Sequence, residues 1–196
     1  MANRHELVAS DILPMEEYAK QRTEWRRRIG AIKRNRRVEV GPFVTFYFES
    51  YDTMWLQVQE MIYIEKGGPA QVPDELEAYN PLIPKGAELT ATFMIEIDDP
   101  DRRARILATL GGIEETAFIR IGDETVRTIP EQDQDRTTAE GKASSVQFVH
   151  FPFTPAQIAA FSQPGAQVIL GLDHPDYRHM TVLPESVRSE LTRDFG

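Results

Sequence analysis

The feature that most constrains the fold is an arrangement of elements that occurs twice in the second half of the chain. Each copy has a strand, a capping residue followed by proline, a helix, a glycine and a second strand. The copies span residues 91–121, with Asp99 as the cap, and residues 145–172, with Thr154. Asp or Thr at an N-cap accepts backbone N–H groups, and proline fits the first helical position. The pattern therefore predicts two βαβ units.

Two βαβ units joined by other elements are the plan of ferredoxin-like folds, in which helices cover one face of an antiparallel sheet. Residues 43–49 are aromatic and β-branched and predict another strand, whereas residues 51–65 and 73–80 have the pattern of helices. Residues 79–84 are punctuated by prolines and are expected to be extended. We predict an α+β fold with a mainly antiparallel sheet, as an elaborated ferredoxin-like arrangement.

A long basic helix is predicted after Pro14, where apolar residues recur at helical spacing. Residues 20–37 hold nine of the 22 basic side chains and one acid, Glu24, which gives this segment a charge of +8. Because the whole chain has a charge of -9, the remainder carries -17. Such a helix either docks on an acidic partner or lies across the protein's own acidic body. The docking residues would be Arg26, Arg27, Arg28, Lys33, Arg34, Arg36 and Arg37.

Composition limits the class of protein. Residues 1–196 are expected to form one domain, with residues 1–40 as the basic helix packed on the body. The absence of cysteine excludes disulfides and thiolate-bound zinc or iron–sulfur clusters. No apolar leader and no run of 18 apolar residues occurs, so we expect a cytoplasmic protein without membrane contact. A pI of about 5.0 disfavours binding to nucleic acid.

Two histidines lie where strand alternation gives them a defined face. His150 and His174 each continue the apolar face of a predicted strand. If these strands are neighbours, both imidazoles emerge near one edge of the sheet, beside carboxylates such as Glu96, Asp173 or Glu60. Two neutral imidazoles with one or two carboxylates suit Fe, Mn or Zn as divalent ions. The alternative is that both histidines are structural and hydrogen-bonded.

No sequence-local catalytic motif supports a particular reaction. H-E-x-x-H, G-x-S-x-G, a phosphate-binding loop and a dinucleotide fingerprint are all missing. The sequence therefore does not decide whether the protein is an enzyme. A further alternative is a small-molecule pocket lined by residues 79–84.

Several segments also carry a family resemblance. They are Glu17 and Tyr18 with residues 26–28 and 33–37, then residues 41–49 with 59–61, then residues 75–84 with 91–94, and finally residues 173–177. With these segments the chain resembles the uncharacterised bacterial family domain of unknown function 3501 (DUF3501) over nearly its whole length. The resemblance transfers no catalytic role. It implies a setting beside rubrerythrin-like proteins and iron–sulfur oxidoreductases, hence in iron-linked redox or peroxide handling.

The leading hypothesis is an accessory protein of such a system that binds a divalent metal through His150, His174 and either Glu96 or Glu60. The alternative is a non-catalytic interaction module that docks through the basic helix. The metal hypothesis requires both imidazoles to lie on one patch of the molecule, beside a carboxylate.

Overall fold

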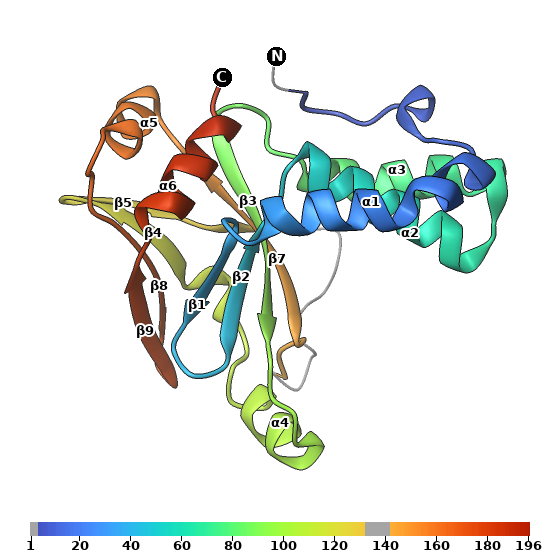
Figure 1. The fold of residues 1–196 in the computed structure, drawn as a ribbon. Coiled ribbons are helices and arrows are strands. Elements are labelled where there is room, and N and C mark those ends of the chain that lie inside the picture. The colour runs from blue at the N-terminus through green and yellow to red at the C-terminus, as the bar shows by residue number, and fades with distance from the viewer. Residues whose placement is uncertain (1–3, 132–141) are drawn as a thin grey trace.

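Two antiparallel sheets and a layer of helices make up the computed structural model, which describes residues 4–131 and 142–196 (Figure 1). The strand orders are β1-β2-β3-β7-β6 in the first sheet and β5-β4-β8-β9 in the second. The first sheet comprises β1 (Arg37–Val40), β2 (Val44–Phe48), β3 (Glu88–Ile95), β7 (Val146–Pro152) and β6 (Ile129–Pro130). The second comprises β5 (Glu124–Arg127), β4 (Ala117–Ile121), β8 (Val168–His174) and β9 (Tyr177–Val182). Neighbouring strands are antiparallel throughout.

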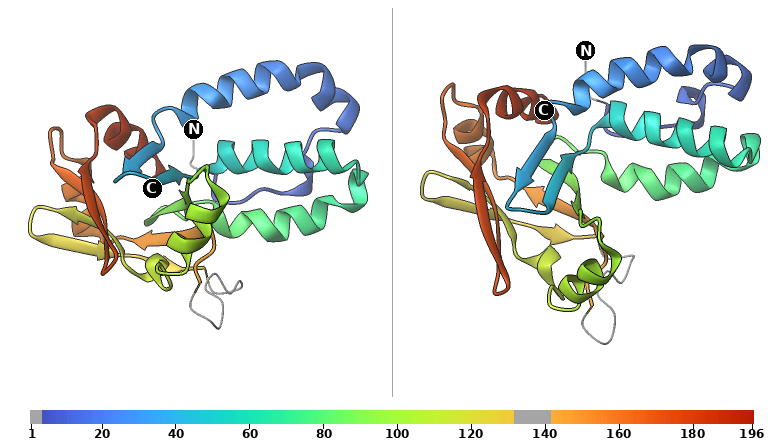
Figure 2. Two further views of the ribbon diagram at one scale, coloured as in Figure 1. Left: turned by 90° about the horizontal axis from the view of Figure 1, so that it is seen from below. Right: turned by 60° about the horizontal axis from the view of Figure 1, so that its bottom comes forward.

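Six α-helices occur in the described residues, namely α1 (Met15–Lys33), α2 (Tyr51–Glu65), α3 (Val72–Tyr79), α4 (Pro100–Leu107), α5 (Pro155–Ser162) and α6 (Glu185–Leu191). Figures 1 and 2 show α1, α2 and α3 side by side in a layer that extends from one side of the first sheet. Helices α5 and α6 lie close together at one end of the two sheets (Figure 1). None of these described helices is both long and apolar enough to cross a membrane.

The main hydrophobic core lies between the two sheets. Because side chains alternate along a strand, Val44, Phe46 and Phe48 of β2 all point into it. The ring of Phe46 lies 4.9 Å from that of Phe93 and 6.4 Å from that of Phe151, measured between centroids. All five side chains are buried and apolar, so this core holds the sheets together.

A smaller core lies within the helical layer. The indole rings of Trp25 in α1 and Trp55 in α2 are 4.7 Å apart, and Tyr18 meets Trp55 edge to face at 6.1 Å. The turn after α3 contributes Leu82 and Ile83 to the same cluster, and Phe148 of β7 packs against it from the first sheet. The helices are thus joined to the face of the sheet that points away from the main core.

The elements predicted from local patterns are largely confirmed. Helix α1 follows Pro14, α2 has the predicted bounds, and α3 lies within one residue of its predicted position. The two predicted caps form, since the side chains of Asp99 and Thr154 accept the backbone N–H groups of Arg102 and Gln157. The acidic loop expected at residues 130–142 falls mostly outside the described residues.

The ferredoxin-like arrangement is wrong, because neither repeated unit returns to the sheet in which it starts. Strand β3 belongs to the first sheet and β4 to the second, and β7 and β8 are divided in the same way. Helices α4 and α5 therefore connect two layers, whereas a βαβ unit places both strands in one sheet. The local pattern predicts a strand, a helix and a strand but carries no information on strand pairing.

Two shorter segments also differ from the prediction. Residues 80–82 form a 3-10 turn rather than an extended loop. The basic helix expected within residues 1–40 ends at Lys33, and Arg37–Val40 forms strand β1 instead, whose Val38 and Val40 point into the main core. The alternating valines of this four-residue strand are a weak strand signal, because charged residues lie on both sides of them in the sequence.

Candidate functional site

A cavity of about 450 Å³ lies between the helical layer and the first sheet, and we call it the helix–sheet pocket. Its volume falls in the range of small-molecule sites. Helices supply one wall and strands β2, β3 and β7 the other, and the lining side chains are Lys33, Arg36, Tyr47, Phe48, Glu49, Thr53, Met54, Gln57, Tyr79, Leu82, Thr92, Met94, Val146 and Phe148. Two of them, Tyr79 and Leu82, belong to residues 79–84, the segment that the sequence offered as an alternative pocket lining.

The chemically distinctive group in the pocket is the carboxylate of Glu49, a residue that is only 7% exposed. Glu49 follows β2 directly and lies on the helical face of the sheet, where the strand's alternation places it. Its two oxygens accept hydrogen bonds from the hydroxyls of Thr53, at 2.7 Å, and Thr92, at 2.8 Å. Within residues 4–131 and 142–196 it forms no ion pair. A buried carboxylate held only by neutral donors is a strong acceptor for a cation.

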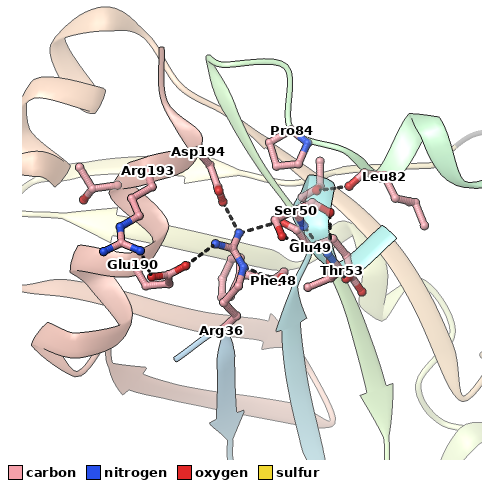
Figure 3. A network of polar contacts seen from close by, with 12 residues as sticks. Arg36, Phe48, Glu49, Ser50, Thr53, Leu82, Pro84, Glu190, Arg193 and Asp194 are labelled. Atoms are coloured by element: carbon pink, nitrogen blue, oxygen red, sulfur yellow. Dashed lines mark hydrogen bonds and ion pairs between the residues drawn. The ribbon is translucent and has the colours of Figure 1, made fainter. Parts of the chain in front are cut away.

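Arg36 neighbours Glu49, but its charge is matched elsewhere. Arg36 is 2% exposed, and its guanidinium forms an ion pair with Asp194 and lies 3.4 Å from a carboxylate oxygen of Glu190 (Figure 3). It also donates to the carbonyl oxygens of Phe48, at 3.0 Å, and Glu49, at 2.7 Å. Burial raises the pKa of Asp194 to about 6, against the lowering effect of Arg36. Arg36 therefore fixes the backbone that carries Glu49.

The lining of the pocket also includes one exposed cation. Lys33, the last residue of α1, lines the cavity and is exposed to solvent. Arg37 lies over the ring of Tyr47 at 5.6 Å, and the Tyr47 hydroxyl donates to Glu96 at 2.8 Å. Burial is the largest cause of the raised pKa of Tyr47, with Glu96 acting in the same direction. The phenol therefore stays protonated at neutral pH.

His150 and His174 do not come together, so the predicted site is not assembled. His150 belongs to the first sheet, where its ring nitrogens meet Glu88 at 3.2 Å and Glu131 at 2.9 Å. These carboxylates, Glu88 first, raise the pKa of His150 despite burial. His174 belongs to the second sheet and contacts backbone at both nitrogens, the carbonyl of Gly111 at 3.1 Å and the N–H of Asp176 at 3.2 Å.

The carboxylates predicted to join them lie elsewhere. Glu96 shares a sheet face with His150, but Thr90 is the residue paired with His150, and six residues of strand place Glu96 roughly 20 Å away. Glu60 lies in the helical layer. Its carboxylate accepts hydrogen bonds from the Tyr18 hydroxyl, at 2.5 Å, and from Nε and Nη2 of Arg22. The described part of the chain holds no group of three or more His, Asp or Glu side chains suited to a metal ion. Alternation predicts on which face of its strand a side chain lies, but it does not predict which sheet the strand joins.

The predicted docking residues divide into paired and unpaired cations. Arg36 is not available to a docking partner, contrary to the expectation, because it is buried and ion-paired within the protein. Arg27 pairs with Glu24 at 2.6 Å, and Arg37 with Glu39 at 3.1 Å. Arg28 lies 5.3 Å from the ring of Trp25. The side chains of Arg26, Lys33 and Arg34 are exposed and form no ion pair with the described residues.

The polar centre of the pocket, Glu49 with Thr53 and Thr92, was not predicted from the sequence, because neither a histidine nor a cluster of like charges marks these positions. One indication was present: Thr45, Tyr47 and Glu49 alternate with Val44, Phe46 and Phe48, which marks a polar face on an otherwise apolar strand. The partners Thr53 and Thr92 come from a helix and from another strand. No spacing in the sequence connects them to Glu49.

Known proteins give a family and a fold but no function. A crystal structure of a "novel protein of unknown function" from Burkholderia pseudomallei has 35% sequence identity and a TM-score of 0.89, and the alignment covers 97% of this chain and 99% of that one. No curated protein matches the sequence. The family described as "Protein of unknown function (DUF3501)" matches residues 6–195. The expected family is thereby confirmed, and the chain belongs to DUF3501.

Proposed function

We propose that the protein binds a small organic molecule in the helix–sheet pocket and recognises a cationic group of that molecule through Glu49. The carrying observation is a buried carboxylate, without an ion pair among the described residues, that lines a cavity of about 450 Å³. An unpaired buried charge is costly, and an ammonium or other N–H cation from a ligand would offset that cost.

The acceptor capacity of Glu49 supports this. An ionised carboxylate has about four lone-pair positions, and the hydroxyls of Thr53 and Thr92 occupy one on each oxygen. Each oxygen therefore retains capacity for a ligand donor. Because Thr53 also bonds to the backbone of Ser50, its hydroxyl is held in place before a ligand arrives.

The remaining walls suit the apolar body of such a molecule. Tyr47, Tyr79 and Phe148 provide aromatic surface, and the faces of aromatic rings attract cations. Met54 and Met94 provide flexible apolar contacts that adapt to different shapes. Few polar groups and a mostly apolar lining are the usual composition of small-molecule sites.

The test compares amines with uncharged molecules of the same shape. Hexylamine and phenethylamine, titrated by calorimetry, are expected to bind, whereas hexanol and 2-phenylethanol bind more weakly. Glu49→Gln keeps the size of the side chain and removes its charge, and it should weaken amine binding by about tenfold or more. Glu124→Gln, at an exposed position of β5 in the second sheet, is the control and should bind as the parent does. Equal binding of amines and alcohols, or an unchanged affinity in Glu49→Gln, would contradict the proposal.

The iron-linked accessory role remains a prediction from the family resemblance, as does association with rubrerythrin-like or iron–sulfur oxidoreductase proteins. It does not depend on a site formed by His150 and His174, which the two sheets keep apart. Elemental analysis of untagged protein after reconstitution with iron, manganese and zinc tests the metal-binding part. Retained stoichiometric metal would support it, and near-zero retention would remove it.

Docking through α1 is a second candidate function, favoured by the exposed cations Arg26, Lys33 and Arg34 that have no ion pair in the described residues. Their charge is available to an acidic protein surface. Binding of such a partner should weaken steeply from low to high salt. A triple substitution to Gln should abolish this salt dependence, and an unchanged dependence would count against docking.

A further inference from the structure

The two unmatched charges of the helix–sheet pocket have opposite signs. Of the three lining residues that carry formal charge, Arg36 is neutralised by Asp194 and Glu190. The other two are the buried carboxylate of Glu49 and the exposed ammonium of Lys33, and neither has an ion pair with a described residue. Nearby Arg37 is not a further free charge, because Glu39 lies 3.1 Å from it.

We propose that the ligand is amphoteric, with a cationic group for Glu49 and a carboxylate or similar anionic group for Lys33. This inference rests on the proposed function, because it assigns the cationic end of the ligand to Glu49. It adds that the molecule is oriented with its cation inward and its anion at the solvent-exposed rim. Amino acids and amino-acid-like molecules with an apolar body are the chemical class that fits.

Charge balance distinguishes this class from simpler ligands. A plain amine would match Glu49, but its uncompensated positive charge would be repelled by the ammonium of Lys33. A plain carboxylate would match Lys33 but would face the buried charge of Glu49. Only a molecule with both charges matches both residues, and selection against the two simpler classes comes from repulsion as well as attraction.

The two charges are expected to differ in their effect on affinity. Glu49 is buried, so its interaction with a ligand cation is weakly screened by water and strong. Lys33 is exposed, so its contribution should resemble that of a surface ion pair, at most about fivefold in affinity. Glu49 therefore determines whether a ligand binds, and Lys33 selects among ligands that do.

The experiment uses matched sets of probes in which only the charged groups change. One set is 6-aminohexanoate, hexylamine and hexanoate, and the other is phenylalanine, phenethylamine and 3-phenylpropanoate, which place the charges far apart and close together. In the parent protein, the amphoteric member of at least one set should bind about threefold to fivefold more tightly than its amine, and the carboxylate should bind most weakly.

Substitutions then assign the effect to residues. Lys33→Gln should lower the affinity for the amphoteric probe to that of the amine and leave the amine unchanged or slightly tighter. Arg34→Gln is the matched control, because it removes the same charge from the adjacent exposed residue, which does not line the pocket. It should preserve the preference for the amphoteric probe. Unliganded melting temperatures verify that all variants are folded.

The inference is overturned if the amphoteric probes of both sets bind no better than their amines, or if Lys33→Gln and Arg34→Gln behave alike. In either case, amine binding that still depends on Glu49 would leave the proposed function intact. If the amines also fail to bind, or bind equally to Glu49→Gln, both proposals fall together.

Discussion

The two faces of the first sheet differ sharply, although the same strands build both. Toward the second sheet, Phe46, Phe93 and Phe151 are completely buried, and the ring of Phe46 packs at a tilt against the rings of the other two. Toward the helices, β2 and the residue after it present Tyr47 and Glu49, beside a cavity. Alternation along a strand thus separates two tasks, because one set of positions packs the fold together while the intervening set remains available for recognition.

The polarity of the helical face explains why a cavity persists there. Apolar side chains gain free energy by filling space, whereas a carboxylate must keep room for its hydrogen-bond donors. The helical layer is instead held together by its own aromatic cluster and, just after α1, by the ion pair of Arg36 with Asp194. The comparison leads to four predictions on stability.

The largest expected effect is in the core between the sheets. Phe46→Ala should lower the free energy of unfolding by about 3–5 kcal/mol, because it leaves a void among rigid neighbours. The comparison variant is Met94→Ala, which enlarges a cavity that already exists and should cost less than about 2 kcal/mol. Urea unfolding measures both. Equal losses in the two variants would show that the two faces are packed alike.

Arg36→Met is expected to cost about 3 kcal/mol at pH 8, because it leaves a buried carboxylate without its cation. The folded-state pKa of Asp194 is about 6, above its ordinary 3.8, so protonation of Asp194 favours the folded state below pH 6. Loss of Arg36 raises this pKa further, and the deficit of the variant should therefore grow as pH rises through 6. Glu190, the other acid beside Arg36, also raises the pKa of Asp194.

Unfolding at pH 5 and pH 8 distinguishes this explanation from a simple loss of packing. The control is Arg193→Met, which removes an exposed guanidinium that pairs with Glu190 at 2.9 Å and should have little effect at either pH. A deficit in Arg36→Met that does not change with pH would contradict the assigned role of Asp194.

His150 should produce a smaller effect, of about 1 kcal/mol, that depends on pH. The carboxylates of Glu88 and Glu131 raise its folded-state pKa above the ordinary 6.5. The stabilisation is therefore fully present below pH 6.5 and is lost as pH rises through the raised pKa. His150→Asn should be less stable than the parent at pH 6 and approach it at high pH. Glu88→Gln should show part of the same change. If the stability of His150→Asn depends on pH in the same way as that of the parent, this explanation is ruled out.

The smallest expected effect is a stabilisation. Gly30 lies inside α1, and a Cβ at this position would meet nothing within 4 Å. Gly30→Ala should therefore raise the melting temperature slightly, by the equivalent of about 0.5–1 kcal/mol. Gly41→Ala is the contrast, because its φ is +72° and a Cβ there would lie 2.5 Å from the Tyr177 hydroxyl. Destabilisation by Gly30→Ala would show that this side of α1 is covered.

The sequence alone determined most of the secondary structure and, for each predicted strand, which side chains share a face. Helices α1 and α2 follow from apolar spacing and start residues, and the caps Asp99 and Thr154 follow from their side-chain chemistry. Alternation also placed His150 on the same face of its strand as Val146 and Phe148, as the structure has it. These features depend on neighbours within a few residues, which a sequence displays directly.

Only the tertiary structure decided which strands pair and which polar groups meet. It divided His150 from His174, buried Arg36 beside Asp194, and brought Thr53 and Thr92 to the carboxylate of Glu49. Such contacts join residues that are far apart in the chain, and several pairings satisfy the same hydrophobic pattern. The choice among them depends on packing of the whole molecule, which local periodicity does not contain.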